Sequence, residues 1–193
     1  MDGHYSLSMA CSHSNGYIVK ELMDYANNND IILELNEKSS EEEVSFLSVA
    51  CSKNNEDIVE LLMDYASKND IILELNKNSE IHELYLLFIA CKNNNNKIVQ
   101  SLINYATKNN IELELNEKKV YMGGIHFCIA CSNDNDEMVE LLMNHATKNN
   151  IKSELNKPDN NGDYPLLLAC SNSNFLCFFH IWIMPIQIIL NWN

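Results

Sequence analysis

The sequence contains seven cysteines and six histidines, the residue types that most often bind zinc or carry redox chemistry. Cys128 and Cys131 form one Cys-x-x-Cys pair, a spacing typical of zinc sites and of thiol–disulfide exchange. A zinc site needs about four ligands, and no second pair or histidine cluster completes one. We also find no nucleophile–base pair and no phosphate-binding glycine loop. The residues therefore predict no metal site, no cofactor and no enzyme.

Five of the cysteines recur at a regular interval, each directly after an alanine. They are Cys11, Cys51, Cys91, Cys131 and Cys170, which lie 40, 40, 40 and 39 residues apart. Equivalent atoms on stacked helices are about 8–10 Å apart, which exceeds the roughly 7 Å that a disulfide permits between Cα atoms. We therefore expect buried free thiols that act as small hydrophobic side chains.

A repeated sequence surrounds each of these cysteines. Residues 50–76 show it most fully, near copies begin at Ala10, Ala90 and Ala130, and a partial copy begins at Ala169. A fixed period of this size predicts a repeat protein in which each unit packs only on its neighbours.

Each copy contains two apolar segments of helical character. The first is short and ends in the Ala-Cys pair; Pro165 suits the first turn of one such helix and Ser45 suits the N-cap of another. The second has an apolar stripe with a period near 3.6, which predicts an amphipathic helix. In residues 50–76 the stripe consists of Ile58, Val59, Leu62, Met63 and Ala66. An asparagine suited to an N-cap precedes the second segment of each full copy, at Asn15, Asn55, Asn95 and Asn135.

The junction at residues 155–169, LNKPDNNGDYPLLLA, resembles the hairpin and first helix of the ankyrin-repeat family. Ile58-Val59-Glu60-Leu61-Leu62 is similar to the second helix of that family, and the resemblance covers roughly residues 3–174. It implies a mainly α solenoid of stacked helix–turn–helix units, joined by loops or short hairpins. The usual unit has about 33 residues, and here six more lie between Ala66 and Leu75. We expect the insertion, residues 67–74, either to lengthen the second helix or to form an extra loop.

The repeat divides the chain into an array and a tail. We assign units one to four to residues 3–43, 44–83, 84–124 and 125–163, and a partial fifth unit to residues 164–174. Residues 175–193 do not follow the repeat.

The net charge is −14, with 13 Lys and Arg against 27 Asp and Glu. Nucleic acid is therefore excluded as an expected partner, since phosphates require clustered basic residues. The acidic charge is compatible with a basic or neutral protein partner, or it simply keeps the array soluble. Free thiols and the absence of an N-terminal signal peptide predict a reducing, cytoplasmic location.

The loop tips and the early first-helix positions differ most between units, while the stripes hardly change. The resemblance implies that these positions line a concave groove that binds protein partners. The variable helix positions are Tyr5, Ser45, Tyr85 and Ile125, and Ser8, Ser48, Phe88 and Cys128. We predict an apolar binding centre with an acidic rim. The centre consists of Ile81, Tyr85, Phe88, Tyr121 and Met122, and the rim of Glu41, Glu42 and Glu43. The alternative is that loop tips vary because nothing constrains them.

The tail contains an apolar run at residues 175–190 that is shorter than the roughly 20 residues needed to cross a membrane. It also contains His180, Pro185 and Gln187, so a membrane anchor is a minor alternative. The genetic code favours another interpretation. When the last base of each codon is joined to the first two of the next, the codons from Ile181 onward permit Met-Asp-Tyr-Ala-Asn-Thr-Asn-Asn-Ile-Lys-Leu-Glu, which matches residues 23–34 closely. We therefore predict that the tail is translated out of frame.

These features favour a non-catalytic protein-binding module or scaffold. Two alternatives remain, a regulatory repeat fragment of a larger protein and a decayed fragment without function.

Overall fold

The computed structural model describes residues 3–37, 44–76, 86–113, 125–149, 155, 158–159 and 161–190. Within these residues the chain forms ten helices and no β-strand. The first helices of the units are α1 (Gly3–Ser12), α3 (Phe46–Ser52), α5 (Leu86–Lys92), α7 (Ile125–Ser132) and α9 (Pro165–Ser171). The second helices are α2 (Gly16–Asn28), α4 (Glu56–Lys68), α6 (Asn96–Lys108), α8 (Asp136–Lys148) and α10 (Phe175–Leu190).

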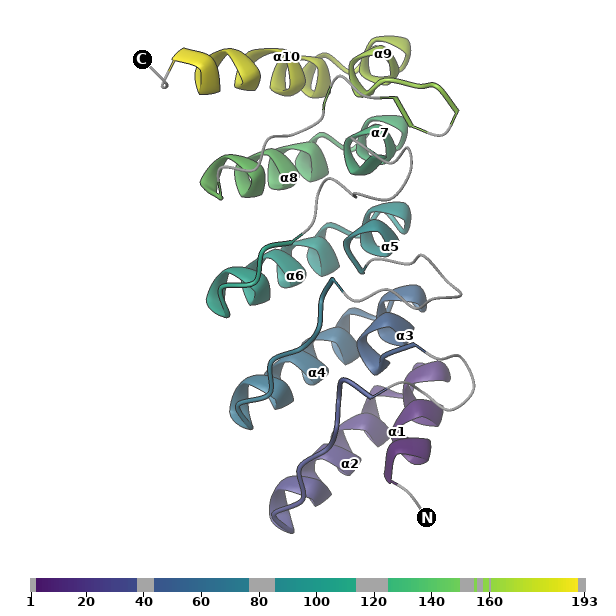
Figure 1. The fold of residues 1–193 in the computed structure, drawn as a ribbon. Coiled ribbons are helices and arrows are strands. Elements are labelled where there is room, and N and C mark those ends of the chain that lie inside the picture. Colours follow the sequence, from purple (N-terminus) through teal and green to yellow (C-terminus); the bar gives the residue numbers. More distant parts are fainter. Residues whose placement is uncertain are drawn as a thin grey trace.

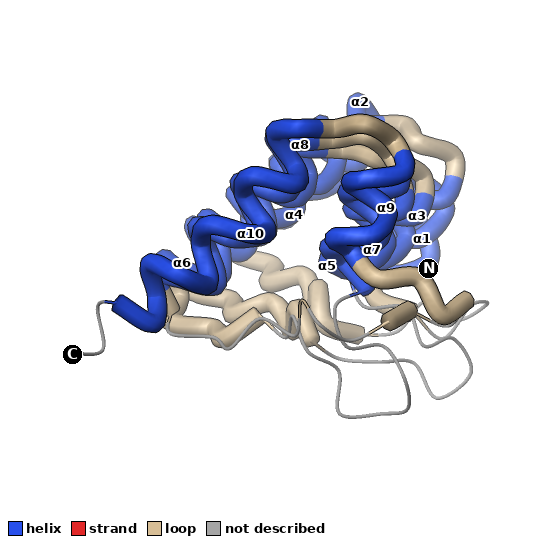
Figure 2. Tube along the Cα trace, turned by 90° about the horizontal axis from the view of Figure 1, so that it is seen from above, coloured by secondary structure: helices blue, strands red, loops and turns tan. Residues whose placement is uncertain are grey.

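The helix pairs stack into a solenoid with two layers (Figure 1). Each first helix contacts the next first helix, and each second helix contacts the next second helix. The short turns within the pairs lie along one edge, and the extended segments that follow α2 and α4 lie along the opposite edge (Figure 2). This arrangement confirms the predicted mainly α solenoid.

The core is a periodic set of side chains between neighbouring pairs. The predicted stripe of α4 is buried in full. The alanines before the repeated cysteines are buried in all five units, at Ala10, Ala50, Ala90, Ala130 and Ala169. Burial of this kind stabilises each unit only through its neighbours.

The predicted caps are present. The side-chain oxygen of each N-cap asparagine accepts a hydrogen bond from the backbone N–H three residues later, at 2.9–3.1 Å in the four full units. Ser45 caps α3 in the same way through Ser48, and Pro165 occupies the first turn of α9. Each asparagine thereby pairs one of the amides that a helix start leaves without an internal partner.

The same asparagines also join the units. Their side-chain amide donates to the turn of the preceding pair: Asn55 to the carbonyl of Ser14, Asn95 to Asn54 Oδ1 at 2.9 Å, and Asn135 to the corresponding Asn94. Those turn residues have φ near +55°, a left-handed conformation that Asn adopts more readily than most residues. Asn55, Asn95 and Asn135 therefore each start a helix and also bond to the preceding unit, which favours one register of stacking.

The insertion lengthens the second helix and also forms an extended segment. α4 continues to Lys68, Asp70 adopts φ +55°, and residues 71–74 then run without helix or strand. The Ile71 N–H donates to the Ala66 carbonyl at 2.9 Å, which closes the helix end as a Schellman motif does. Both expectations for the insertion are therefore partly confirmed.

The extended segments after α2 and α4 each bond to a tyrosine of the next unit. The Tyr65 hydroxyl donates to the Ile31 carbonyl at 3.1 Å and accepts from the Leu33 N–H at 3.2 Å. Tyr105 makes the equivalent bonds with Ile71 and Leu73, at 3.0 and 3.2 Å. We call this pair of bonds the tyrosine bridge. It satisfies backbone groups of an irregular segment that would otherwise be left unpaired near the core.

α10 occupies the place of a second helix in the fifth unit, with Cys177 and Ile181 buried. No helix of the described residues is long and apolar enough to cross a membrane.

Candidate protein-binding surface

The first-helix face is the outer side of α1, α3, α5, α7 and α9. Phe88 lies on this face in α5 and is half-buried. Its ring meets the imidazole of His126 edge-on, with centroids 6.5 Å apart and planes at 81°. This contact holds the phenyl ring between units three and four while part of it remains accessible, as an aromatic anchor requires.

The other variable positions of the first helices differ in exposure. Ser8 and Ser48 are half-buried and Tyr5 is exposed, so these residues can contact a partner. Ile125 and Cys128 are buried, which corrects their assignment to the groove surface. The Cys128 thiol donates to the Asp163 carbonyl at 3.3 Å, so the loop before α9 covers it.

Of the eight predicted partner-binding residues, the structure describes only Phe88, and partner binding by Phe88 stays a prediction. The other seven lie outside the described residues; they are Glu41, Glu42, Glu43, Ile81, Tyr85, Tyr121 and Met122.

Lys92 is a surface residue that the sequence analysis missed. It is exposed at the end of α5, four residues after Phe88, and side chains at this spacing share one side of a helix. Units one, two, four and five have a serine at the position of Lys92, and its hydroxyl donates to the carbonyl three residues earlier. The departure from serine in unit three was visible in the sequence and could have identified Lys92.

Acidic residues are absent from the first helices and concentrate on second helices such as α4 and α8. Lys97 of α6 pairs with Glu56 of α4 at 3.0 Å, and hydrogen bonds from Lys97 and Asn95 lower the pKa of Glu56. The second helices therefore carry more negative charge than the first helices. The first helices, including α5 with Phe88 and Lys92, contain no Asp or Glu.

One loop tip is described in detail, between Asp159 and Asp163. The Asp159 N–H donates to the Asp163 carbonyl at 2.8 Å, and the Asp159 carboxylate accepts from the amides of Asn161 and Asp163. Gly162 has φ +85°, which favours glycine at this turn. These bonds form a turn between Asp159 and Asp163 directly before α9.

Residues 87–179 match a sequence model described as ankyrin repeats (3 copies), and the 40-residue repeat carries the same pattern through units one and two. Residues 87–179 belong to the ankyrin-repeat family. No curated protein matches it. Ankyrin repeats are generally protein–protein interaction modules and are typically non-catalytic.

The repeated cysteines of this ankyrin array are buried free thiols in units one to four, as predicted. Burial raises the pKa of Cys11 and Cys51 to about 12 and raises that of Cys91 and Cys131 as well, so these thiols stay protonated. Cys170 is exposed, which corrects the prediction for unit five. In the other units the next helix pair covers this position. No group of three His, Cys, Asp or Glu in the described part of the chain could hold a metal ion.

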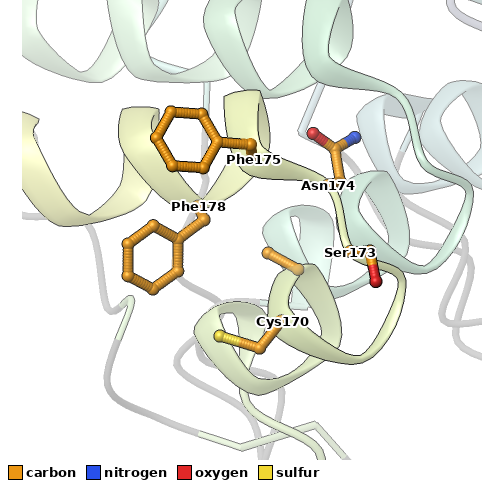
Figure 3. Close-up of a pocket in the computed structure, with 6 residues that line it drawn as sticks. Cys170, Ser173, Asn174, Phe175 and Phe178 are labelled. Atoms are coloured by element: carbon orange, nitrogen blue, oxygen red, sulfur yellow. The ribbon is translucent and has the colours of Figure 1, made fainter.

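Beside Cys170 lies a shallow pocket of about 250 Å³ between α9 and α10. Figure 3 shows the Phe178 ring and the Cys170 thiol on its two sides. Ala169, Ser173, Asn174 and Phe175 complete the lining. The pocket carries no charged group and belongs to the stacking side of the fifth unit.

Proposed function

We propose that this chain is a non-catalytic ankyrin module that binds a protein partner through its concave first-helix face and the adjoining loop tips. One observation carries the proposal. In unit three, Phe88 and Lys92 replace residues that are serines in units one and two, and Phe88 remains half-buried. Because units one and two have serine at these positions, stacking of the units does not require Phe88 or Lys92. Both side chains are therefore available to bind a partner.

The pair suggests the chemistry of the partner. A half-buried aromatic ring provides a contact centre, since binding energy concentrates in such anchors. Lys92 adds a cation on the same side of α5 and favours a carboxylate in the partner. We therefore propose a segment with an apolar anchor next to an acidic residue, held at its flanks by Ile81, Tyr85, Tyr121 and Met122. The acidic loop Glu41–Glu43 would contact a basic or polar part of the same partner.

Selection of displayed peptides on the full chain tests this proposal. Bound sequences should contain an apolar residue beside Asp or Glu, and Phe88→Ala should weaken them about tenfold or more. Lys92→Glu should weaken the acidic sequences specifically. Asp64→Ala, an exposed change on α4, is the matched control and should leave binding unchanged. Unchanged binding to Phe88→Ala, with normal helical circular dichroism, would reject the proposed surface.

We also propose that residues 175–193 are translated out of frame. The array would then be a repeat fragment of a larger protein, and we propose that this protein is cytoplasmic. The exposed positions of α10 support this. Leu176 stands where Asp57, Lys97 and Glu137 are exposed, and Phe179 stands where Glu60 and Glu140 are exposed. A helix selected for this place would not expose leucine and phenylalanine there. Sequencing of gene and transcript across codons 170–193 should show a missing or extra base; an uninterrupted frame would reject this interpretation.

A further inference from the structure

The end of α8 differs from the equivalent ends of α4 and α6. In those helices a buried tyrosine, Tyr65 or Tyr105, bonds through its hydroxyl to the extended segment of the preceding unit. In α8 the same position carries His145, of which 4% is exposed. Its Nε2 atom is enclosed and has no hydrogen-bond partner among the described residues. Buried polar atoms are almost always paired, so the junction of units three and four contains an exceptional group.

The neighbouring asparagine determines which ring nitrogen carries the proton. The side-chain amide of Asn149 donates to the His145 carbonyl at 2.8 Å and lies 3.2 Å from the His145 Nδ1 atom. An amide nitrogen can only donate, so Nδ1 accepts and the neutral imidazole carries its hydrogen on Nε2. Asn69 makes the same bond to the carbonyl of Tyr65, where the phenol ring has no nitrogen to accept a second one. The contact between ring and amide therefore distinguishes unit four from the units with tyrosine.

No carboxylate of the packed helices can neutralise a charge on this ring. α6, α7 and α10 pack against α8, and none of the three contains Asp or Glu. Their titratable groups are Lys97, Tyr105, Lys108, His126, Cys128, Cys131, Cys177 and His180. Glu112, after α6, is exposed, and the last carboxylate of α8 itself is Glu140, five residues before His145. Burial, and then the positive charge of Lys148, lower the pKa of His145.

We propose that the junction of units three and four is an acid-sensitive contact, which opens when His145 takes up a second proton. The proton can bind only at Nδ1, where its hydrogen would point at the Asn149 amide, itself a donor. The resulting cation is enclosed with two N–H groups and no acceptor among the described residues, which costs far more free energy than a neutral ring. Movement of the ring into water relieves both conflicts. That movement requires the last turn of α8 to separate from unit three.

The direction of the pH effect follows from the pKa. A free imidazole has a pKa of about 6.5, and the pKa of His145 in the folded chain is lower. The open form therefore binds the proton more tightly, and the closed contact loses stability as pH falls below about 6.5. At about pH 5.5, one unit lower, protonation favours the open form by up to about tenfold. The C-terminal end of a helix attracts cations, but burial and Lys148 outweigh this attraction for the enclosed ring.

The two preceding junctions contain no such group at this position. Tyr65 and Tyr105 occupy it, and acid adds no charge to a phenol. Acid should therefore open the array at one junction and leave the two before it closed.

NMR of the full chain, with hydrogen exchange measured between about pH 7.5 and 5.5, tests this proposal. The reporter is the Asn149 N–H, which donates to the His145 carbonyl at 3.2 Å. The internal control is the Asn69 N–H, which makes the equivalent bond to Tyr65 at 3.1 Å. After correction for the intrinsic pH dependence of exchange, protection of Asn149 should fall about fivefold to tenfold, and that of Asn69 should stay the same. In the same samples the His145 imidazole should titrate with a midpoint below about 6.5.

Variants assign the effect to the ring. His145→Tyr restores the residue of units one to three and should abolish the pH dependence of exchange at Asn149. His145→Phe should do the same although it restores no hydrogen bond, because the effect requires a titratable group. The matched control is His13→Gln, which removes an exposed histidine of unit one and should leave the pH dependence at Asn149 unchanged.

Four results would overturn the proposal: protection of Asn149 that does not change with pH, equal losses of protection at Asn149 and Asn69, a His145 midpoint at or above about 6.5, or a pH dependence that persists in His145→Tyr. The first three are measured on the natural chain, so they do not depend on the folding of a variant. If circular dichroism shows that His145→Tyr is unfolded, His145→Phe decides the fourth.

Discussion

The tyrosine bridge leads to a sharp prediction at Tyr105. The side chain is buried, and its hydroxyl donates to the Ile71 carbonyl at 3.0 Å and accepts from the Leu73 N–H at 3.2 Å. Tyr105→Phe keeps the ring and its packing and removes only the oxygen. The change therefore isolates the two hydrogen bonds that the Tyr105 hydroxyl of unit three makes with unit two.

The expected loss follows from the two bonds. A hydrogen bond contributes about 1 kcal/mol net, and a buried group left without a partner costs about 1–3 kcal/mol. The bond from Leu73 is buried, whereas the Ile71 carbonyl lies in a partly buried site that water can reach. We expect Tyr105→Phe to lower the free energy of unfolding by about 2 kcal/mol.

Urea unfolding followed by circular dichroism measures this loss, with Tyr25→Phe as the matched control. The Tyr25 hydroxyl has no partner among the described residues, so the control should change stability by less than about 0.5 kcal/mol. Solenoids can unfold in stages, and hydrogen exchange at the Leu73 amide therefore provides a local measurement. Its exchange should accelerate in Tyr105→Phe.

A Tyr105→Phe chain as stable as the natural one, with unchanged exchange at Leu73, would refute this reasoning. The tyrosine bridge would then contribute nothing to stacking.

Four further predictions concern other repeat positions. His145 stands at the tyrosine position and bonds to neither Ile111 nor Leu113, so His145→Tyr should raise stability by about 1 kcal/mol in urea titrations. Burial and Lys148 lower the pKa of His145, so the natural chain should lose stability as pH falls below about 6.5, and the tyrosine variant should lose less. Asn95→Ala removes a cap and two bonds to unit two and should cost about 2 kcal/mol, against about 1 kcal/mol for Asn15→Ala, which removes the cap alone. Maleimide should modify Cys170 well before Cys51, as mass spectrometry of the folded chain would show.

Sequence periodicity predicted the apolar and capping positions that recur in the units. The stripe of α4 and the N-cap asparagines are specified by spacing within one unit, so comparison of the copies was sufficient to identify them. Prediction was wrong where a neighbour decides exposure. Cys128 was expected on the surface and is covered by the loop at Asp163, whereas Cys170 was expected to be buried and is exposed beside the pocket of α9 and α10.

The proposed binding surface was visible in the sequence only in part, for a related reason. Phe88 was identifiable because a large apolar residue replaces serine in a repeated position. Its edge-on contact with His126 depends on the angle between α5 and α7, and no pattern within a unit specifies that angle. Lys92 is the last residue of α5, whereas the variable positions considered in the sequence are those early in the first helices.

The link between Tyr105 and the insertion could not be predicted, because one partner is main chain. The hydroxyl bonds to the Ile71 carbonyl and the Leu73 N–H, groups that almost any residue supplies, so the sequence of the segment carries no mark of the contact. The structure nevertheless accounts for the long repeat. The extra residues form a segment whose backbone needs a partner, and the tyrosine of the next unit supplies it. At α8 the tyrosine is replaced by His145, and no bond to Ile111 or Leu113 forms there. Stacking of units three and four therefore depends more on the apolar contacts around Met138 and Leu142.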